Sequence, residues 1–285
     1  MKYAAVMFDI VESRRYNDRY DVQNVLMESI SYLNRLYGYE IKKEVVSSAG
    51  DEFQGLFMNL QTAFLYIRKL QLLIYPIIIR CGIGYGAIKY YDKEWESSAL
   101  DGEAFYLCRD AINSIQKRKS NAICFNTVSK YDKYLNMFCM ADAEIKSKQS
   151  QMVRLIELIA DIIFPITPTK EDMSFYDFIL KSRVKLIRQE SWNRVIGKYR
   201  EKEALDINFE QLIEIKQMME AKSAYENAFY MEDFWMHGMS TYIAQIINTT
   251  RQNVDRYVSL GKVKESRTMD KAMYELLGEE IWWIL

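Results

Sequence analysis

The order of secondary-structure patterns in the first 125 residues most restricts the fold of this 285-residue chain. Five segments are short apolar runs bounded by turn residues, which is typical of buried strands: 3–9, 40–48, 53–58, 77–88 and 121–125. Three segments between them have helical patterns: 15–37, 60–74 and 103–117. The chain therefore runs strand, helix, strand, strand, helix, strand, and then adds one more helix and strand.

This order predicts an α+β fold with a ferredoxin-like, or palm, N-terminal domain, in which one sheet carries helices on one side. The first strand of such a domain lies beside the hairpin of the second and third strands. Asp9 closes the first strand and Asp51 lies at the tip of the hairpin. We therefore expect these two carboxylates to lie near each other.

The second half of the chain has a different character. Long helical patterns cover 149–164, 174–200 and 209–235, with prolines 165 and 168 breaking the first from the second. An all-helical region is therefore predicted after the palm domain. The expected division is a palm domain at 1–145, a helical linker region at 146–236 and a helix-turn-helix region at 237–285.

Composition excludes several classes of protein. A net charge of −1 gives no overall basic field for nucleic acid or anionic membrane, so any nucleic-acid surface must be local. No apolar stretch reaches the ~18 residues of a transmembrane helix. The chain begins directly with a strand-like run, and its four cysteines lie singly without CxxC spacing. We expect a cytoplasmic protein with buried free thiols.

A single histidine, His237, restricts the chemistry further. A Ser-His-Asp triad, a Cys-His pair and a multi-histidine zinc site are all excluded or unfavoured. Any enzymatic activity would have to use carboxylates, a metal ion, arginine and lysine.

The carboxylates at the strand end and the hairpin tip suit a hard cation such as Mg²⁺ or Mn²⁺, which prefers oxygen ligands. Asp9, Asp51 and the carbonyl of Ile10 are the predicted ligands, and Glu52 is an additional one. A carboxylate directly after a buried strand is costly unless it is paired. In the alternative interpretation, Asp9 only ends a strand and Asp51 only makes a turn.

Two further features surround this predicted metal site. Arg14 and Arg15 follow the first strand, where they could meet the phosphates of a nucleotide bound beside Gly50, although they could equally be a solvated helix start. The strand at 77–88 has glycines at 82, 84 and 86, which leave one face bare. Such a face permits the close approach of a ligand or of another backbone segment.

Several motifs resemble known nucleotide-processing domains. Residues 8–10 (Phe-Asp-Ile) followed by 49–53 (Ala-Gly-Asp-Glu-Phe) resemble the catalytic core of GGDEF diguanylate cyclases, class III nucleotide cyclases and CRISPR-associated palm polymerase-cyclases. Residues 80–88 and 101–109 resemble a class III cyclase strand and helix start. Overall, the chain is most similar to the bacterial SatD family, whose shared motifs are at 8–14, 50–55, 80–84 and 101–104, with a C-terminal helix-turn-helix.

The resemblance to cyclases implies particular roles and also shows departures. Asp9 and Asp51 match the metal-binding aspartates, and Arg109 matches the arginine that steadies the transition state. Phe105 stands where cyclases have an asparagine, and Ser47 stands where they have a base-reading lysine. The metal and phosphate half of a cyclase site is therefore expected to remain, and the base-reading half is expected to differ. The resemblance also implies a homodimer.

Residues 239–262 predict a helix-turn-helix. Ser240 or Thr241 is expected to cap its first helix, Asn248 to occupy the turn, and Thr250 to cap the second helix. The second helix would present side chains able to contact base edges of double-stranded DNA: Arg251, Gln252, Asn253 and Arg256. The alternative is an ordinary helical hairpin that binds protein.

Three functional hypotheses remain open from the sequence. The first is a magnesium-dependent nucleotidyl transferase of cyclase type coupled to a DNA-binding region. The second is a nucleotide-sensing transcriptional regulator whose site has lost turnover. The third is a protein-interaction module without a small ligand.

Overall fold

The computed structural model describes residues 1–16, 18–90, 101–118, 121–169, 171–188, 207–225 and 234–279. The chain divides into two compact units. The first comprises Met1–Glu144 together with Met273–Leu285, and the second comprises Ile145–Ala272. Residues 146–236 and 237–272, which the sequence assigned to separate regions, thus lie in one unit. The apolar C-terminus around Trp282 lies outside the described residues.

The first unit is built on a mixed sheet with the strand order β2-β3-β1-β4-β5, and β6 pairs with β4. Its strands are β1 (Lys2–Ile10), β2 (Ile41–Ala49), β3 (Glu52–Phe57), β4 (Ile79–Tyr90), β5 (Asp101–Gly102) and β6 (Ile123–Asn126). Strand β1 runs antiparallel to both β3 and β4, whereas β6 runs parallel to β4. The order β4-β1-β3-β2 is that of a ferredoxin-like sheet, and it confirms the predicted α+β arrangement of the strands.

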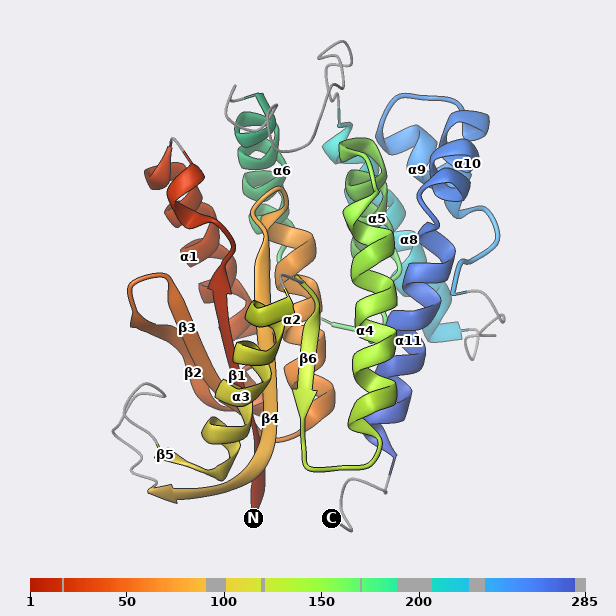
Figure 1. Ribbon diagram of the computed structural model, residues 1–285. Coiled ribbons are helices and arrows are strands. Elements are labelled where there is room, and N and C mark those ends of the chain that lie inside the picture. Colours follow the sequence, from red (N-terminus) through yellow and green to blue (C-terminus); the bar gives the residue numbers. More distant parts are fainter. Residues whose placement is uncertain are drawn as a thin grey trace. The chain divides into compact units, whose positions relative to one another are not determined.

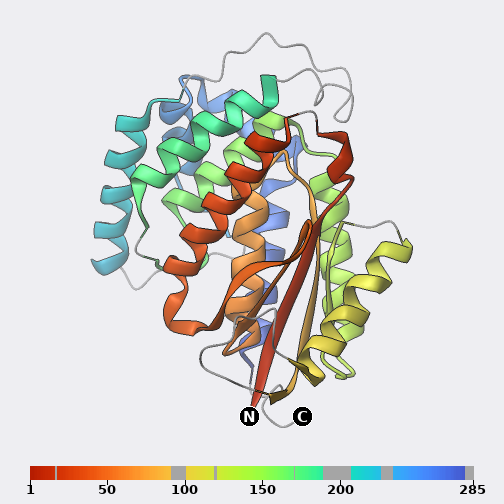
Figure 2. The ribbon, with the colours of Figure 1, turned by 90° about the vertical axis from the view of Figure 1, so that its left-hand side faces the viewer.

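Helices cover both faces of this sheet (Figures 1 and 2). The helices are α1 (Arg19–Leu36), α2 (Leu60–Ile74), α3 (Glu103–Arg118) and α4 (Asp132–Ser147), with short 3-10 turns η1 (Ser13–Arg15) and η2 (Gly38–Glu40). In Figure 2 the helices α1 and α2 lie on one side of the sheet and α3 lies on the other. The prediction of helices on one side holds for α1 and α2, and it is incomplete because α3 covers the second face.

The central strand β1 shows the consequence of this double cover. Residues 4–8 are at most 1% exposed, so both faces of the strand are buried. A strand buried on both faces needs an unbroken apolar run rather than an alternating one. That requirement accounts for the continuous apolar sequence before Asp9.

The bare face of β4 is occupied by helix α3. A Cβ atom at Gly84 would lie 2.2 Å from the carbonyl oxygen of Ala104 and 2.3 Å from the backbone nitrogen of Cys108. A Cβ atom at Gly82 would lie 2.4 Å from the carbonyl oxygen of Cys108. Of the two uses that the sequence left open for these glycines, close approach of a backbone segment is therefore the one observed.

Helix α4 closes one edge of the sheet through a single side chain. The Asn136 amide donates to the carbonyl oxygen of Phe125 at 2.9 Å and accepts from the Phe125 N–H at 2.7 Å. These two bonds satisfy backbone groups of the edge strand β6, which would otherwise be available to another strand.

Every described element after β6 is helical, as the sequence predicts for the residues beyond 145, whereas α4 was not predicted. The second unit contains α5 (Gln151–Ile163), α6 (Met173–Arg188), α8 (Phe209–Tyr225), α9 (Met239–Ile246), α10 (Arg251–Leu260) and the first part of α11 (Val263–Gly278). The predicted helices 174–200 and 209–235 extend beyond Arg188 and Tyr225 into residues that lie partly outside the described part. No helix in the described ranges is long and apolar enough to cross a membrane.

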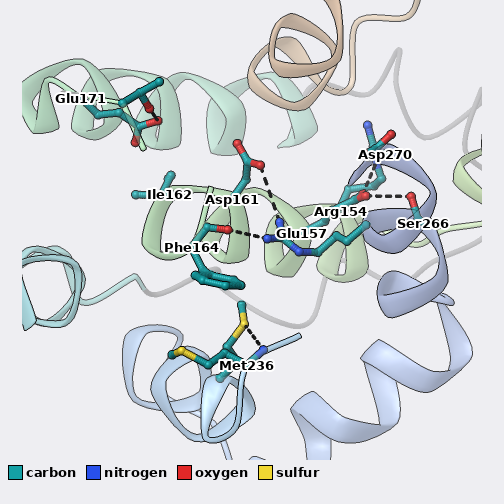
Figure 3. Close-up of polar contacts among 12 residues, drawn as sticks. Arg154, Glu157, Asp161, Ile162, Phe164, Glu171, Met236, Ser266 and Asp270 are labelled. Carbon is teal, nitrogen blue, oxygen red and sulfur yellow. Dashed lines mark hydrogen bonds and ion pairs between the residues drawn. The ribbon is translucent and has the colours of Figure 1, made fainter. Parts of the chain in front are cut away.

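Helix α5 is the core of the second unit and carries paired buried charges (Figure 3). All residues from Val153 to Ile163 are buried. Arg154 Nη1 lies 2.6 Å from Glu157 Oε2, and the other oxygen of Glu157 accepts a bond from Ser266 on α11 at 3.2 Å. Burial of these charges is tolerated because each has a partner.

The helices α9 and α10 are joined by a four-residue connection. Asn248 has φ 50°, and the Thr250 side chain accepts the backbone N–H of Asn253, so both of these expectations are confirmed. The prediction that Ser240 or Thr241 caps the first helix is wrong. Helix α9 begins at Met239 after Gly238, whose carbonyl accepts the N–H of Thr241, so both predicted caps lie inside the first turn.

Candidate functional site

A row of three charged residues crosses the sheet where its apolar surface ends. In the strand register Asp9 of β1 lies opposite Glu52 of β3 on one side and opposite Arg80 of β4 on the other. Directly opposite residues point to the same face of a sheet, so the three side chains share one face. Two residues back along β1, the same face carries Met7, which belongs to the apolar core beneath α3. We call Glu52, Asp9 and Arg80 the charged row.

Helix α3 covers the apolar part of this face and then reaches the charged row. Ala104, Phe105 and Cys108 pack against the sheet residues of the apolar core. Further along the helix, Gln116 Nε2 donates to Asp9 Oδ2 at 3.0 Å, and Arg109 Nη2 lies 3.5 Å from Glu52 Oε1. The same helix therefore seals one end of the face and supplies polar groups at the other.

The charges of the row are balanced once Arg109 is counted with it. Glu52 and Asp9 are like charges on neighbouring strands, which is unfavourable by itself. Arg80 Nε contacts Asp9 Oδ1 at 2.6 Å, and Arg109 offsets Glu52. Side-chain exposure rises from 15% at Asp9 and 25% at Arg80 to 33% at Glu52 and 58% at Arg109. The row thus passes from a sheltered ion pair to one that is open to water.

The hairpin turn decides which acidic residue faces Asp9. Ala49 pairs with Glu52, so Gly50 and Asp51 form a two-residue turn. Gly50 has φ +61°, and glycine at the first central position is typical of a type II′ hairpin turn. Glu52 is therefore the residue opposite Asp9, and Asp51 lies exposed at the tip.

The structure brings together three residues of the predicted site: Asp9, Glu52 and Arg109. Ile10 follows Asp9 on β1, is 5% exposed and pairs with Ile79. Arg14 is exposed on η1 directly after β1, and the side chain of Arg15 lies outside the described part. Among the described contacts, none joins Arg14 or Asp51 to the charged row.

The donor chemistry of the row fits a hard cation only in part. Within the described residues there is no group of three or more His, Cys, Asp or Glu arranged to hold a metal ion. Magnesium commonly binds through one or two carboxylates, with substrate phosphates and water completing its shell. Asp9 and Glu52 can supply such a pair, but a cation at Asp9 shares a carboxylate that Arg80 and Gln116 already contact.

Arg80 and Gln116 belong to this site, although neither is among the site residues predicted from the sequence. Arg80 stands two positions before Gly82, so alternation along the strand places it on the α3 face. Gln116 lies about two helical turns beyond Arg109, on the same side of α3. Strand alternation combined with helical spacing was the signal that could have found both.

The cysteines near this face are not candidates for chemistry. Cys81 and Cys108 are buried free thiols, as expected, and burial raises the pKa of both well above its ordinary value. The Cys108 thiol donates to the carbonyl oxygen of Gly82 at 3.0 Å. A thiol with a raised pKa holds little thiolate, which is the reactive and metal-binding form.

Helix α10 forms a second surface of interest. Val254 and Val258 are buried, whereas the four residues predicted to contact DNA are all exposed: Arg251, Gln252, Asn253 and Arg256. Asp255 shares this surface and lies 3.4 Å from Arg251. The exposed surface of α10 thus has two arginines and two amides, with one carboxylate partly neutralising them.

The fold and the charged row together define an α+β protein with a ferredoxin-like sheet and a polar site at its strand ends. A model of the SatD family matches residues 3–177, more than half of the chain, and the protein belongs to the SatD family. This membership confirms the resemblance seen in the sequence motifs.

Other comparisons add little to this assignment. A search of curated proteins found no match. One solved structure, described as that of a bacterial light-regulated adenylyl cyclase, is similar at 14% identity with a TM-score of 0.32. The similarity covers 44% of this chain and 42% of that one. The fold assignment therefore rests on the strand order observed here.

Proposed function

We propose that the first unit binds a nucleotide together with Mg²⁺ or Mn²⁺ at the charged row. If the site catalyses a reaction, we propose that the reaction is a cyclase-like nucleotidyl transfer. The observation that carries this proposal is the arrangement of Glu52, Asp9 and Arg80 with Arg109 above them. Carboxylates that can hold a cation and arginines that can hold phosphate lie within one small group. The phosphates of a nucleotide bind divalent cations and also accept hydrogen bonds from arginine, so a nucleotide suits both kinds of side chain.

In this proposal each residue has a distinct task. Asp9 and Glu52 bind the cation, with the Ile10 carbonyl and Asp51 as further oxygen donors. Arg109 is 58% exposed and contacts Glu52 at only 3.5 Å, so its guanidinium can turn to a phosphate. A bound divalent cation would offset phosphate charge and polarise a phosphoryl oxygen. Arg14, Arg15 and Gly50 border the same end of the sheet and would contact the nucleotide's phosphates.

A second candidate is a nucleotide sensor without turnover, and the position of Phe105 favours it. Phe105 stands where the resembling cyclases have an orienting asparagine, and it is 6% exposed within the apolar core. An aromatic ring buried there cannot orient a ligand through hydrogen bonds. Binding without cyclisation is consistent with that replacement.

We further propose that α9 and α10 act as a helix-turn-helix for double-stranded DNA, so that nucleotide binding in one unit regulates a cytoplasmic DNA-binding protein that works as a homodimer. The support is local. Thr250 begins α10 with a side-chain cap, and Arg251, Gln252, Asn253 and Arg256 are exposed on this helix. These side chains are the types that read base edges in a major groove.

Calorimetric titration tests the nucleotide proposal. Each common nucleoside triphosphate is titrated into the full chain with Mg²⁺ and with Mn²⁺, and products are followed by chromatography. We expect binding to weaken at least tenfold in Asp9→Asn, because a cation ligand loses its charge. Asp177→Asn, at an exposed α6 position paired with Lys181, is the matched control and should bind normally.

The three functional hypotheses give different outcomes in this experiment. Product formation that Asp9→Asn abolishes supports the enzyme. Tight binding without product supports the sensor. No binding of any triphosphate by the unmodified chain would contradict both and leave a protein-interaction role.

A further inference from the structure

Each carboxylate oxygen of Asp9 contacts a neighbouring side chain. Its Oδ1 atom lies 2.6 Å from Arg80 Nε, and its Oδ2 atom accepts the Gln116 amide at 3.0 Å. Its side chain is 15% exposed, so the carboxylate has lost most of its hydration. A sheltered carboxylate needs such partners, and charge-assisted hydrogen bonds are the strongest kind available. A cation that approaches Asp9 through Oδ1, the oxygen that contacts Arg80, therefore competes with this guanidinium.

We propose that Arg80 is an internal counter-ion that competes with the divalent cation for Asp9, and that the displaced guanidinium then binds the phosphate of the nucleotide. This proposal rests on the function proposed above and assigns a specific regulatory role to Arg80. It makes cation binding weak by itself and strong when phosphate is present.

The charge balance of the row supports this coupling. Glu52 and Asp9 carry two negative charges, and Arg80 and Arg109 carry two positive ones, so the group is neutral in this structure. A divalent cation alone would leave these four residues with two excess positive charges. The phosphates of a nucleotide would remove that excess. Each ligand should therefore raise the affinity for the other, and such coupling is reciprocal.

The position of Arg80 suits the exchange. It lies on β4 directly beside Asp9, and its side chain is 25% exposed, so the guanidinium borders solvent. A guanidinium is planar and matches phosphate oxygens with two parallel hydrogen bonds. A short movement of the side chain can therefore replace one carboxylate partner by phosphate, without any change in the strand.

Arg80→Met tests the proposal because methionine keeps much of the length of the side chain and removes its charge. Binding of Mn²⁺ alone to the full chain is measured by electron paramagnetic resonance. Binding of inorganic triphosphate with Mn²⁺ present is then measured by calorimetry. We expect Mn²⁺ alone to bind about tenfold more tightly, since a charged competitor worth that factor is removed. We expect triphosphate to bind about tenfold more weakly, because a phosphate partner is lost.

If Arg80 competes with the cation, Arg80→Met changes the two affinities in opposite directions: Mn²⁺ binds more tightly and triphosphate binds more weakly. If Arg80 merely held Asp9 in place for the metal, both affinities would fall. Arg35→Met, at an exposed position in the last turn of α1, is the matched control and should change neither. Circular dichroism establishes that each variant is folded.

A second variant keeps the proposal testable if Arg80→Met does not fold. Gln116 is exposed on α3, so Gln116→Leu should fold and release only the Asp9 Oδ2 contact. We expect about threefold tighter Mn²⁺ binding from the loss of one hydrogen bond. Unchanged or weaker Mn²⁺ binding in the folded variants would overturn the proposal.

Binding by the unmodified chain distinguishes a failure of the proposed competition from a failure of the proposed nucleotide-binding function. If it binds Mn²⁺ with triphosphate but removal of Arg80 does not tighten Mn²⁺ binding, only the competition is wrong. If neither the unmodified chain nor the variants bind Mn²⁺ or triphosphate, the proposed function and this inference both fail.

Discussion

Single residues show how this chain places charge beside a buried core. Asp9 is the penultimate residue of β1, and the five residues before it are at most 1% exposed. Arg80 and Gln116 stabilise its carboxylate there. The same solution recurs in the second unit, where Glu157 is buried against Arg154 and Ser266. In both places a carboxylate is tolerated because its oxygens contact donors from other elements or, for Glu157, from the preceding helical turn.

The buried thiols lead to a prediction about stability at high pH. Burial raises the pKa of Cys81 and Cys108 above the ordinary 9.0. In the unfolded chain these thiols ionise near that value, whereas in the folded protein they keep their protons. Their contribution to stability is therefore complete below pH 9 and is lost as the pH rises towards the folded pKa values. Between pH 9 and the folded pKa values, we expect the free energy of unfolding to fall by roughly 1 kcal/mol per pH unit for each such thiol.

Urea unfolding at pH 7, 9 and 10 measures this dependence. Cys108→Ala removes one titrating group, so its stability should fall less steeply between pH 9 and 10 than that of the unmodified chain. Identical slopes for the two proteins would show that the thiol does not titrate as inferred.

At the scale of elements, helix α3 has two tasks on one face of the sheet. Its first turns pack Ala104 and Cys108 against glycines of β4, and its later turns deliver Arg109 and Gln116 to the charged row. The position of these polar side chains therefore depends on how closely the helix can approach the strand. A change in packing at the glycines of β4 would therefore move Arg109 and Gln116 relative to the charged row.

The substitution Gly84→Ala tests this dependence on close packing. The added Cβ would lie 2.2 Å from the Ala104 carbonyl oxygen, and neither backbone segment can yield cheaply. We expect a loss of about 3 kcal/mol in the free energy of unfolding. Gly38→Ala is the control, because nothing lies within 4 Å of its Cβ position, and it should change stability by less than about 0.5 kcal/mol. Chemical denaturation of both variants decides the point, and equal stabilities would contradict the packing role.

At the scale of the whole molecule, the chain carries one proposed site in each compact unit. The charged row lies in the first unit, and the exposed surface of α10 lies in the second. A net charge of −1 means that neither site is assisted by a general electrostatic field. Any DNA binding must therefore come from the local group of residues on α10.

The DNA proposal predicts a specific and salt-dependent loss of binding. Selection of bound sequences from a random duplex pool identifies a target, and fluorescence anisotropy then measures affinity for it. Arg251→Ala should reduce affinity by about 1–3 kcal/mol, the usual value of a good base contact, and binding should weaken as salt rises. Lys181→Ala on α6 is the control and should bind as the unmodified chain does. Binding that is insensitive to Arg251 would exclude α10 as the reading helix.

The sequence was sufficient for features that depend on local periodicity. Apolar runs and helical spacing predicted the strands β1 to β4 and β6, the helices α1 to α3 and an all-helical second half, but not the short strand β5. Glycine and asparagine chemistry predicted the Gly50 turn and the backbone conformation of Asn248. Each of these features depends on a few neighbouring residues, so the pattern contains the necessary information.

Three features of the candidate site depended on contacts between distant residues. Strand register placed Glu52, rather than Asp51, opposite Asp9. Packing of α3 filled the glycine face of β4, and the same packing brought Gln116 to Asp9. Asp9 and Gln116 lie 107 positions apart in the sequence, so no local pattern relates them.

The sequence by itself predicted most of the strands and helices and the Gly50 hairpin turn, and it marked Asp9 as a carboxylate at the end of a buried strand. Only the tertiary structure decided that Asp9 is flanked by Glu52 and Arg80 and covered by Gln116. The physical reason is that periodicity records the local preference of each segment. Register and helix placement are instead set by packing among segments far apart in the chain, and that packing places two carboxylates and two arginines in one neutral group.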